Sequence, residues 1–119
     1  MTALVNKLVE SAISAIDTPD RWTKGAFAKN KDGFEVASDD TAATCFCIYG
    51  ALEKAKYSIP IEYKDYYKVI DAIYDSIEFL YPRKYLGVAD FNDHPTTNHK
   101  MVIRVLKHVQ TKFKEKHND

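Results

Sequence analysis

The sequence has few cysteines and no long apolar run. Both features limit the cellular compartments in which we expect the protein. Cys45 and Cys47 are the only cysteines, and neither has a distant partner with which to form a disulfide. We therefore expect reduced thiols in the cytoplasm. No apolar stretch approaches the roughly 20 residues of a membrane span. Asn6, Lys7 and Glu10 interrupt the apolar pattern at the N-terminus, unlike the core of a signal peptide. We predict neither secretion nor membrane association.

The chain also lacks net charge. Its 17 Lys and Arg residues balance 17 Asp and Glu residues, which argues against an overall electrostatic attraction to nucleic acid or a membrane. Hydrophobic residues make up 45% of the sequence, a proportion typical of a globular chain rather than a disordered one. A length of 119 residues suits one domain, and we expect a single domain over residues 1–119.

The spacing of hydrophobic residues predicts an α+β fold with about four helices and one β-hairpin packed on them. Proline and capping residues mark the ends of the helical segments. We expect helices over about Ala3–Ile16, from the capping residues Ser38–Asp40 to Ala55, over about Glu62–Leu80, and from Thr96 or Thr97 to Phe113.

The segment between the first two helices predicts the hairpin. Trp22–Lys29 and Phe34–Ala37 contain aromatic and β-branched residues, and Asn30–Gly33 between them has the composition of a turn. Gly50 lies inside the second helix, where glycine costs about 1 kcal/mol relative to alanine. That cost suggests close approach of another element, such as the hairpin. We expect Arg83–Pro95 to be an irregular loop.

Several short motifs occur in an order that resembles a known family. They are Trp22 followed by Gly25, the helix motif Cys47-Ile-Tyr-Gly50-Ala-Leu52, the loop motif Phe91-Asn92-Asp93, and Thr97 before the final helix. Over roughly residues 12–109 the chain resembles a family of small uncharacterised bacterial and phage proteins. The second cysteine, Cys45, departs from that pattern. The family has no established activity, so the resemblance supports the predicted fold and adds little about function. Membership of phage proteins in the family implies that an accessory or host-modulating role would fit this chain.

The loop residues Asn92, Asp93 and His94 are the most concentrated polar group near expected core aromatics. In a catalytic interpretation Asp93 orients a base or binds a cation, His94 transfers protons, and Cys47 acts as nucleophile. In a structural interpretation Asn92 and Asp93 hold the loop backbone and cap the final helix. Cys47 then packs as a small apolar side chain. We favour the structural interpretation for all of them.

We expect no metal ion and no cofactor. Asp93, His94 and His99 are the only close group of residue types that ligate metals, and a site requires several converging ligands. His108 lies nine residues beyond His99, about two and a half helical turns away, so it does not join them easily.

The final helix has the clearest charge pattern. From Asn98 to His117 it contains six Lys or Arg residues against one Glu, a net charge of +5. Lys100, Arg104, Lys107 and Lys114 share one side of it. They are candidate contacts for phosphates or for an acidic protein, although a solvated helix face is the interpretation we favour. Nucleic-acid binding is also favoured by interleaved aromatic residues, and this side of the helix has none.

Trp22 belongs to a set of aromatic residues that either forms a ligand pocket or contact patch, or fastens the hairpin to the helices. The set also contains Phe27, Phe34 and Tyr49, and we favour the fastening role.

The leading prediction for function is a small accessory protein that acts by binding another protein. A phage-encoded modulator of a host protein is one specific form of this prediction, and the sequence does not decide between a bacterial and a phage origin. The first alternative is a small enzyme or ligand-binding protein that uses the loop from Asn92 to His94. The second is a nucleic-acid binder that uses the basic final helix. The balance of these observations leans away from an enzyme, and the sequence carries no signal of oligomeric state.

Overall fold

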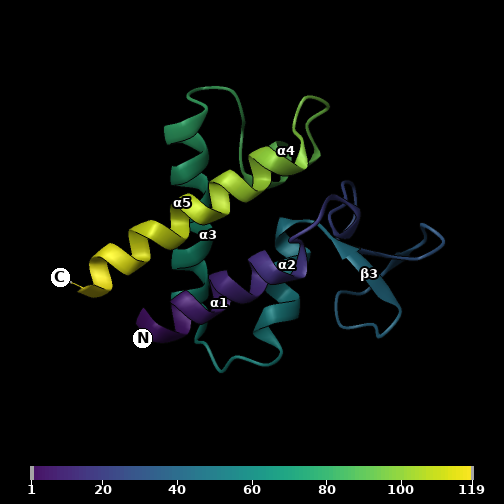
Figure 1. Cartoon of the computed structure of the whole chain (residues 1–119), viewed down its shortest axis with the longest axis horizontal. Coiled ribbons are helices and arrows are strands. Elements are labelled where there is room, and N and C mark those ends of the chain that lie inside the picture. The colour runs from purple at the N-terminus through teal and green to yellow at the C-terminus, as the bar shows by residue number, and fades with distance from the viewer. Residues whose placement is uncertain (1, 119) are drawn as a thin grey trace.

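The chain folds into an α+β architecture of five helices and a three-stranded antiparallel sheet over residues 2–118, the part that the computed structural model describes (Figure 1). Side chains are described for residues 3–114. In chain order the elements are α1 (Thr2–Ala15), the short 3₁₀ helix η1 (Pro19–Arg21), β1 (Ala28–Asn30), β2 (Glu35–Val36), β3 (Ala43–Phe46), α2 (Ile48–Lys56), α3 (Tyr63–Leu80), α4 (Val88–Asp93) and α5 (His99–Asn118). The predicted fold class is confirmed.

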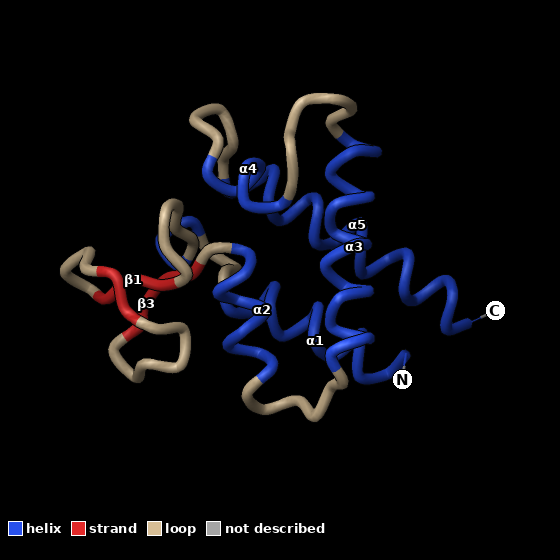
Figure 2. The backbone as a smooth tube through the Cα atoms, turned by 180° about the vertical axis from the view of Figure 1, so that it is seen from behind, coloured by secondary structure: helices blue, strands red, loops and turns tan. Residues whose placement is uncertain are grey.

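The helices form one body and the sheet lies at one end of it. In Figure 1, α1 and α5 run side by side in opposite directions, and α5 crosses α3. The view from behind in Figure 2 places the strands beside α2, at the end of the molecule away from both termini. None of the described helices combines the length and the apolar character that crossing a membrane requires.

The predicted hairpin is present, and a third strand extends it. β1 pairs antiparallel with β2 and with β3, so the strand order is β2-β1-β3. The turn between β1 and β2 is held by the Asn30 side chain, whose Oδ1 accepts hydrogen bonds of 3.0 Å from the amides of Asp32 and Phe34. Gly33 has a φ of 85°, a left-handed conformation that glycine adopts without strain.

The predicted start of the second helix was wrong. The segment Ala43–Phe46 is strand β3, and helix α2 begins only at Ile48. Asp40 does cap, but it caps a turn, because its Oδ1 accepts the amide of Ala42 at 2.8 Å. Cys47 takes the N-cap position of α2, where its Sγ accepts the amide of Gly50 at 3.2 Å. The segment from Ala43 therefore forms a strand because it pairs with β1, even though its apolar residues are spaced as in a helix.

Two further details near the C-terminus differ from the prediction. The expected irregular loop contains the short helix α4, whose first turn is supported by a 2.9 Å hydrogen bond from the Leu86 amide to Asp90 Oδ2. The cap of α5 is Asn98 rather than Thr96 or Thr97, since Asn98 Oδ1 accepts the amide of Met101 at 2.9 Å.

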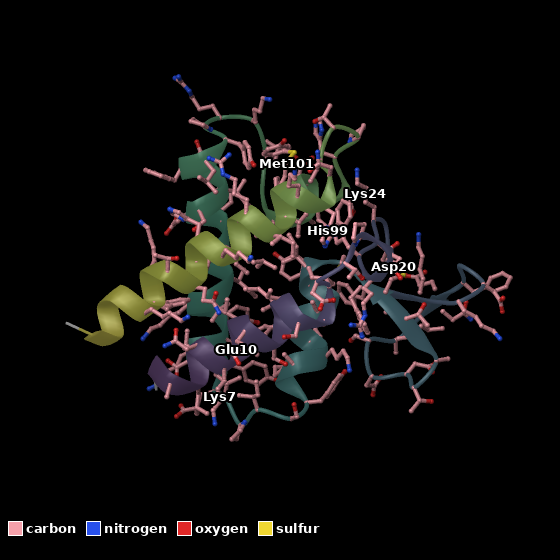
Figure 3. All side chains as sticks on the ribbon, viewed as in Figure 1. Lys7, Glu10, Asp20, Lys24, His99 and Met101 are labelled. Atoms are coloured by element: carbon pink, nitrogen blue, oxygen red, sulfur yellow. The ribbon has the colours of Figure 1, made fainter. Side chains whose placement is uncertain are left out.

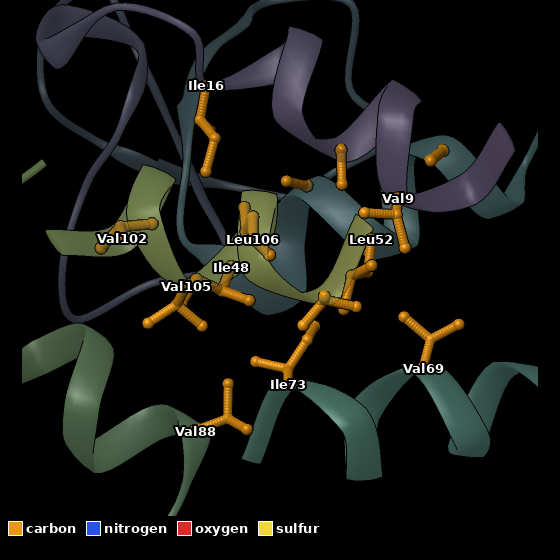
Figure 4. Close-up of a cluster of buried hydrophobic side chains, with 14 of the residues drawn as sticks. Val9, Ile16, Ile48, Leu52, Val69, Ile73, Val88, Val102, Val105 and Leu106 are labelled. Carbon is orange, nitrogen blue, oxygen red and sulfur yellow. The ribbon is translucent and has the colours of Figure 1, made fainter. Parts of the chain in front are cut away.

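Apolar side chains from all five helices meet in a shared core (Figure 4). The core includes Val9, Ile16, Ile48, Leu52, Val69, Ile73, Val88, Val102, Val105 and Leu106. α2 and α4 both contribute to it and contact each other. The N-terminus of α2 lies close to α4, since the Ile48 amide is bonded to Asn92. This proximity creates the junction described below.

Gly50 allows α2 to approach the sheet, as the sequence predicted. A Cβ atom at this position would overlap the carbonyl oxygen of Phe27, just before β1. The same carbonyl accepts the amide of Cys47 at 3.1 Å. The first turn of α2 is thus held directly against the segment that leads into the sheet.

Candidate functional site

Asn92 joins three segments that are far apart in the sequence. Its side chain is only 2% exposed. Oδ1 accepts the indole N–H of Trp22 at 2.9 Å and the amide of Ile48 at 3.0 Å. Nδ2 donates to the carbonyl of Thr23 at 3.1 Å and to Asp93 Oδ1 at 2.9 Å. These four bonds use both donors and both acceptor positions of the amide, so Asn92 holds the fold together and offers little to a ligand.

The residues that follow Asn92 extend this junction. Asp93 Oδ1 accepts the amide of Gly25 at 3.0 Å, and the carbonyl of His94 accepts the Lys24 ammonium at 2.6 Å. The His94 ring lies edge-on to Tyr85, with 5.2 Å between ring centroids. The hydrogen bonds of Asp93 and His94 thus hold the segment Thr23–Gly25 from across the fold, and neither residue caps α5.

A cavity of about 290 Å³ lies on one side of the junction. Cys47, Tyr49, Asp93 and Glu35 contribute to its lining, and we call it the Cys47 cavity. Cys47 is 6% exposed, and burial raises the pKa of its thiol. The thiol therefore stays protonated at neutral pH, and His94 is not among the described residues that line the cavity. The geometry does not pair Cys47 with a base.

A second, larger hollow of about 890 Å³ lies beside Trp22, between the segment that follows α1 and the start of α5. We call it the Trp22 groove; its lining includes Trp22, Lys24, Thr97, His99, Lys100 and Ile103. Figure 3 shows Lys24 and His99 close together at this end of α5.

Trp22 is held firmly at the edge of this groove. Besides its bond to Asn92, it forms a β-bridge with Phe46, and the Lys24 ammonium lies 5.5 Å from its ring centroid. Of the other aromatics of the predicted set, Tyr49 is partly buried and packs against the core, but the two phenylalanines differ. Phe27 and Phe34 are exposed, so they do not fasten the sheet to the helices.

The predicted basic residues Lys100, Arg104, Lys107 and Lys114 are all exposed on α5. We call them the basic face. Aromatic rings from the end of α3 and from the residue that follows it lie near α5, one of them beside the basic face. The Arg104 guanidinium lies 5.6 Å from the ring of Tyr81. The Lys112 ammonium lies 5.7 Å from the ring of Phe79, and that ring stacks on His108 at 5.1 Å.

Sequence reasoning missed one surface, a row of apolar side chains on α3. We call it the tyrosine stripe: Tyr63, Tyr67, Ile70 and Tyr74, spaced by four, three and four residues on one side of the helix. The three tyrosines are 69%, 58% and 38% exposed. The rings of Tyr63 and Tyr67 stack with centroids 6.4 Å apart. The spacing is visible in the sequence, but it lies only about a quarter turn from the buried positions, so the pattern alone does not show that it forms a separate face.

Within the described part of the chain, no three His, Cys, Asp or Glu side chains come together in a way that could hold a metal ion.

The fold and these surfaces define a small α+β protein with a rigid polar junction, two hollows beside it and an exposed aromatic helix face. The chain belongs to a family of unknown function, DUF6197, which matches residues 1–111. No curated protein and no solved structure matched the chain at a significant level.

Proposed function

We propose that this protein is a non-enzymatic binding module that recognises another protein through the tyrosine stripe of α3. The observation that supports the proposal is the exposure of three tyrosines on one side of a single helix. Tyrosine combines a large apolar ring with a hydroxyl group, and it is enriched at protein interfaces and among the residues that dominate their energy.

The stripe is well placed for recognition because its helix is rigid. α3 has 18 residues and is anchored by the buried side chains of Val69, Ile73 and Ile77. A tyrosine has few rotatable bonds, and a fixed helix adds little further ordering on binding. The stripe therefore presents a preformed surface.

The charges around the stripe indicate the chemistry of the partner. Asp71 and Asp75 are exposed beside Tyr74, whereas Lys64 and Lys68 are exposed beside Tyr67. A partner that carries Lys or Arg opposite the two aspartates, acidic residues opposite the two lysines and apolar groups between them would complement this mixed border. We propose such a protein as the partner.

The setting we propose is the cytoplasm of a bacterium, with a phage-encoded accessory protein acting on a host protein as the more specific form. The order of motifs from Trp22 to Thr97, which resembles that of small bacterial and phage proteins, supports this setting. Burial raises the pKa of the Cys47 thiol and so keeps it a poor nucleophile, which supports a role without catalysis at this residue.

The experiment that tests the proposal is an affinity capture from bacterial lysate that compares three forms of the chain. Wild type and Lys107→Glu should recover the same protein in stoichiometric amount after nuclease treatment, while Tyr67→Glu should lose it. Tyr67 and Lys107 are both exposed, so neither change should unfold the chain. Equal recovery by Tyr67→Glu would rule out the stripe.

A second candidate function is nucleic-acid binding on the basic face. The contact of Arg104 with the partly buried ring of Tyr81 supports it, as does the contact of Lys112, elsewhere on α5, with the exposed ring of Phe79, since cations beside aromatic rings suit single-stranded nucleic acid. This candidate requires that affinity for an oligonucleotide fall steeply with salt and that charge reversal at Arg104 and Lys107 abolish it. Affinity that is insensitive to salt would exclude it.

A further inference from the structure

We propose that the Trp22 groove binds a small aromatic phosphate, of which a nucleoside monophosphate is the common cellular form. This site is separate from the tyrosine stripe and goes beyond the proposed function. The groove volume of about 890 Å³ lies within the range of small-molecule sites, roughly 300–1,000 Å³.

One end of the groove carries the features that bind a phosphate. α5 is 20 residues long and begins at His99. Its first amides have no carbonyl partner within the helix, and the helix dipole makes this end attractive to anions. Asn98 caps the amide of Met101, which leaves the amides of His99 and Lys100 for a ligand. Lys24 and Lys100 both line the groove. The Lys24 ammonium donates to the His94 carbonyl at 2.6 Å, which leaves two of its three N–H groups for a ligand.

Thr97 provides an independent indication of a ligand. The residue lines the groove and is 4% exposed. Its hydroxyl oxygen is buried, and no hydrogen-bond partner for it exists among the described residues. A buried hydroxyl without a partner is unfavourable, and a phosphate oxygen at the start of α5 would accept its proton.

The other part of the groove suits a flat ring. Trp22 and Ile103 supply apolar walls. The indole cannot rotate freely, because Nε1 is bound to Asn92. The His99 ring lies 6.3 Å from the indole and is itself held by a 2.6 Å hydrogen bond between Nε2 and the carbonyl of Ile16. The walls are thus fixed before a ligand arrives.

The acidic residues near the groove determine which end takes the phosphate. Asp17 lines the groove, but it pairs with Arg21 at 3.4 Å. Asp20 accepts a 2.6 Å hydrogen bond from the Thr18 hydroxyl. Both carboxylates are thus engaged within the segment that follows α1, so the phosphate is expected beside the two lysines that line the groove, Lys24 and Lys100.

The only tryptophan of the chain, Trp22, is a built-in probe for this site. We would titrate the ¹⁵N-labelled protein with AMP, adenosine and inorganic phosphate and follow the indole N–H signal. AMP should shift the signal saturably, and adenosine and phosphate should each bind at least about tenfold more weakly, since each lacks half of the contacts. A response to adenosine as strong as that to AMP would overturn the assignment of a phosphate site.

Two variants test the residues that bind the phosphate. Lys100→Ala and Thr97→Val should each weaken AMP binding about tenfold, the effect of one lost charge-assisted hydrogen bond. Thr97→Val keeps the shape of the side chain and removes an unpartnered hydroxyl, so its thermal stability should not fall. Lys7→Ala, which removes an exposed lysine of α1 outside the groove, should bind as wild type does. The proposal is overturned if AMP causes no saturable shift, or if all three variants bind AMP equally.

Discussion

The indole Nε1 of Trp22 donates a 2.9 Å hydrogen bond to Asn92 Oδ1, across 70 residues of sequence. This bond lies between the Cys47 cavity, which Asn92 lines, and the Trp22 groove, which Trp22 lines. Lys24, two residues beyond Trp22, lines the Trp22 groove, and Gly25 lines the Cys47 cavity. A single buried amide thus sets the position of a segment that both hollows share.

The Asn92→Ala variant should lower the free energy of unfolding by about 3 kcal/mol. Truncation leaves the Trp22 indole N–H and the Ile48 amide without their acceptor, and each buried polar group left unpaired costs about 1–3 kcal/mol. Urea denaturation followed by circular dichroism measures the loss. A change below about 0.5 kcal/mol, the size of an ordinary surface effect, would contradict the role of Asn92.

The coupling between the two residues can be isolated with Trp22→Phe, which removes the indole N–H and keeps an aromatic ring. In a double-mutant cycle with Asn92→Ala we expect an interaction energy of about 1–2 kcal/mol. Additive effects would show that the hydrogen bond contributes little beyond packing.

The Gly50→Ala variant should destabilise the protein by about 2 kcal/mol, although alanine is the better helix former by about 1 kcal/mol. The reason is the overlap of the new Cβ with the carbonyl of Phe27. Gly87→Ala is the matched control, since nothing lies within 4 Å of a Cβ there. Thermal melts of both variants test the prediction, which fails if Gly50→Ala melts at or above the wild-type temperature.

Cys47 should react slowly with iodoacetamide at pH 7 in the folded protein and quickly in urea. Burial raises the pKa of its thiol, and a protonated thiol is a poor nucleophile. Mass spectrometry of labelled peptides separates Cys47 from the partly exposed Cys45. Labelling of Cys47 in the folded state as fast as in urea would instead favour an activated thiol.

The stability of the fold should decrease at alkaline pH. Burial raises the pKa of both the Cys47 thiol and the Tyr66 phenol above their ordinary values of 9.0 and 10.0. As the pH rises past these values the unfolded chain loses its protons first, so stability is complete below about pH 9 and falls above it. Urea midpoints between pH 7 and 11 measure the effect.

Tyr66→Phe provides the control for the alkaline effect. The Tyr66 hydroxyl is buried and has no hydrogen-bond partner among the described residues. Its removal should leave stability at pH 7 unchanged or slightly higher, and it should flatten the decline above pH 10. A decline as steep as that of wild type would assign the effect to other groups.

The sequence predicted those parts of the fold that depend on local pattern. The stripes of α1, α3 and α5 and the turn at Asn30–Gly33 are local, and they were located to within a few residues. The start of α2 was not, because Ala43–Phe46 pairs with β1, a contact that helical spacing does not reveal. The close approach at Gly50 was predicted because glycine destabilises a helix interior. Its presence there is explained if another element packs too close for a side chain.

The residues of the candidate site could be predicted from the sequence, but the contacts between them could not. Asn92 and Trp22 were both singled out, yet nothing in the sequence indicates that they bind each other across 70 residues. The same limit applies to the cations of α5, whose aromatic neighbours Phe79, in α3, and Tyr81, just after it, come from a distant part of the sequence. Contacts between distant elements depend on packing and are not encoded in any one segment.

The most direct test of the account is site-specific photo-cross-linking with p-benzoylphenylalanine, followed by identification of the cross-linked chain. The photoreactive residue replaces Tyr67 on the tyrosine stripe in one form and Phe34, on the sheet at the other end of the molecule, in the control. Both positions are well exposed. If α3 carries the binding surface, irradiation in bacterial cells should yield one discrete protein adduct from position 67 and none from position 34. The same adducts from both positions, or none from position 67, would contradict a binding surface on α3.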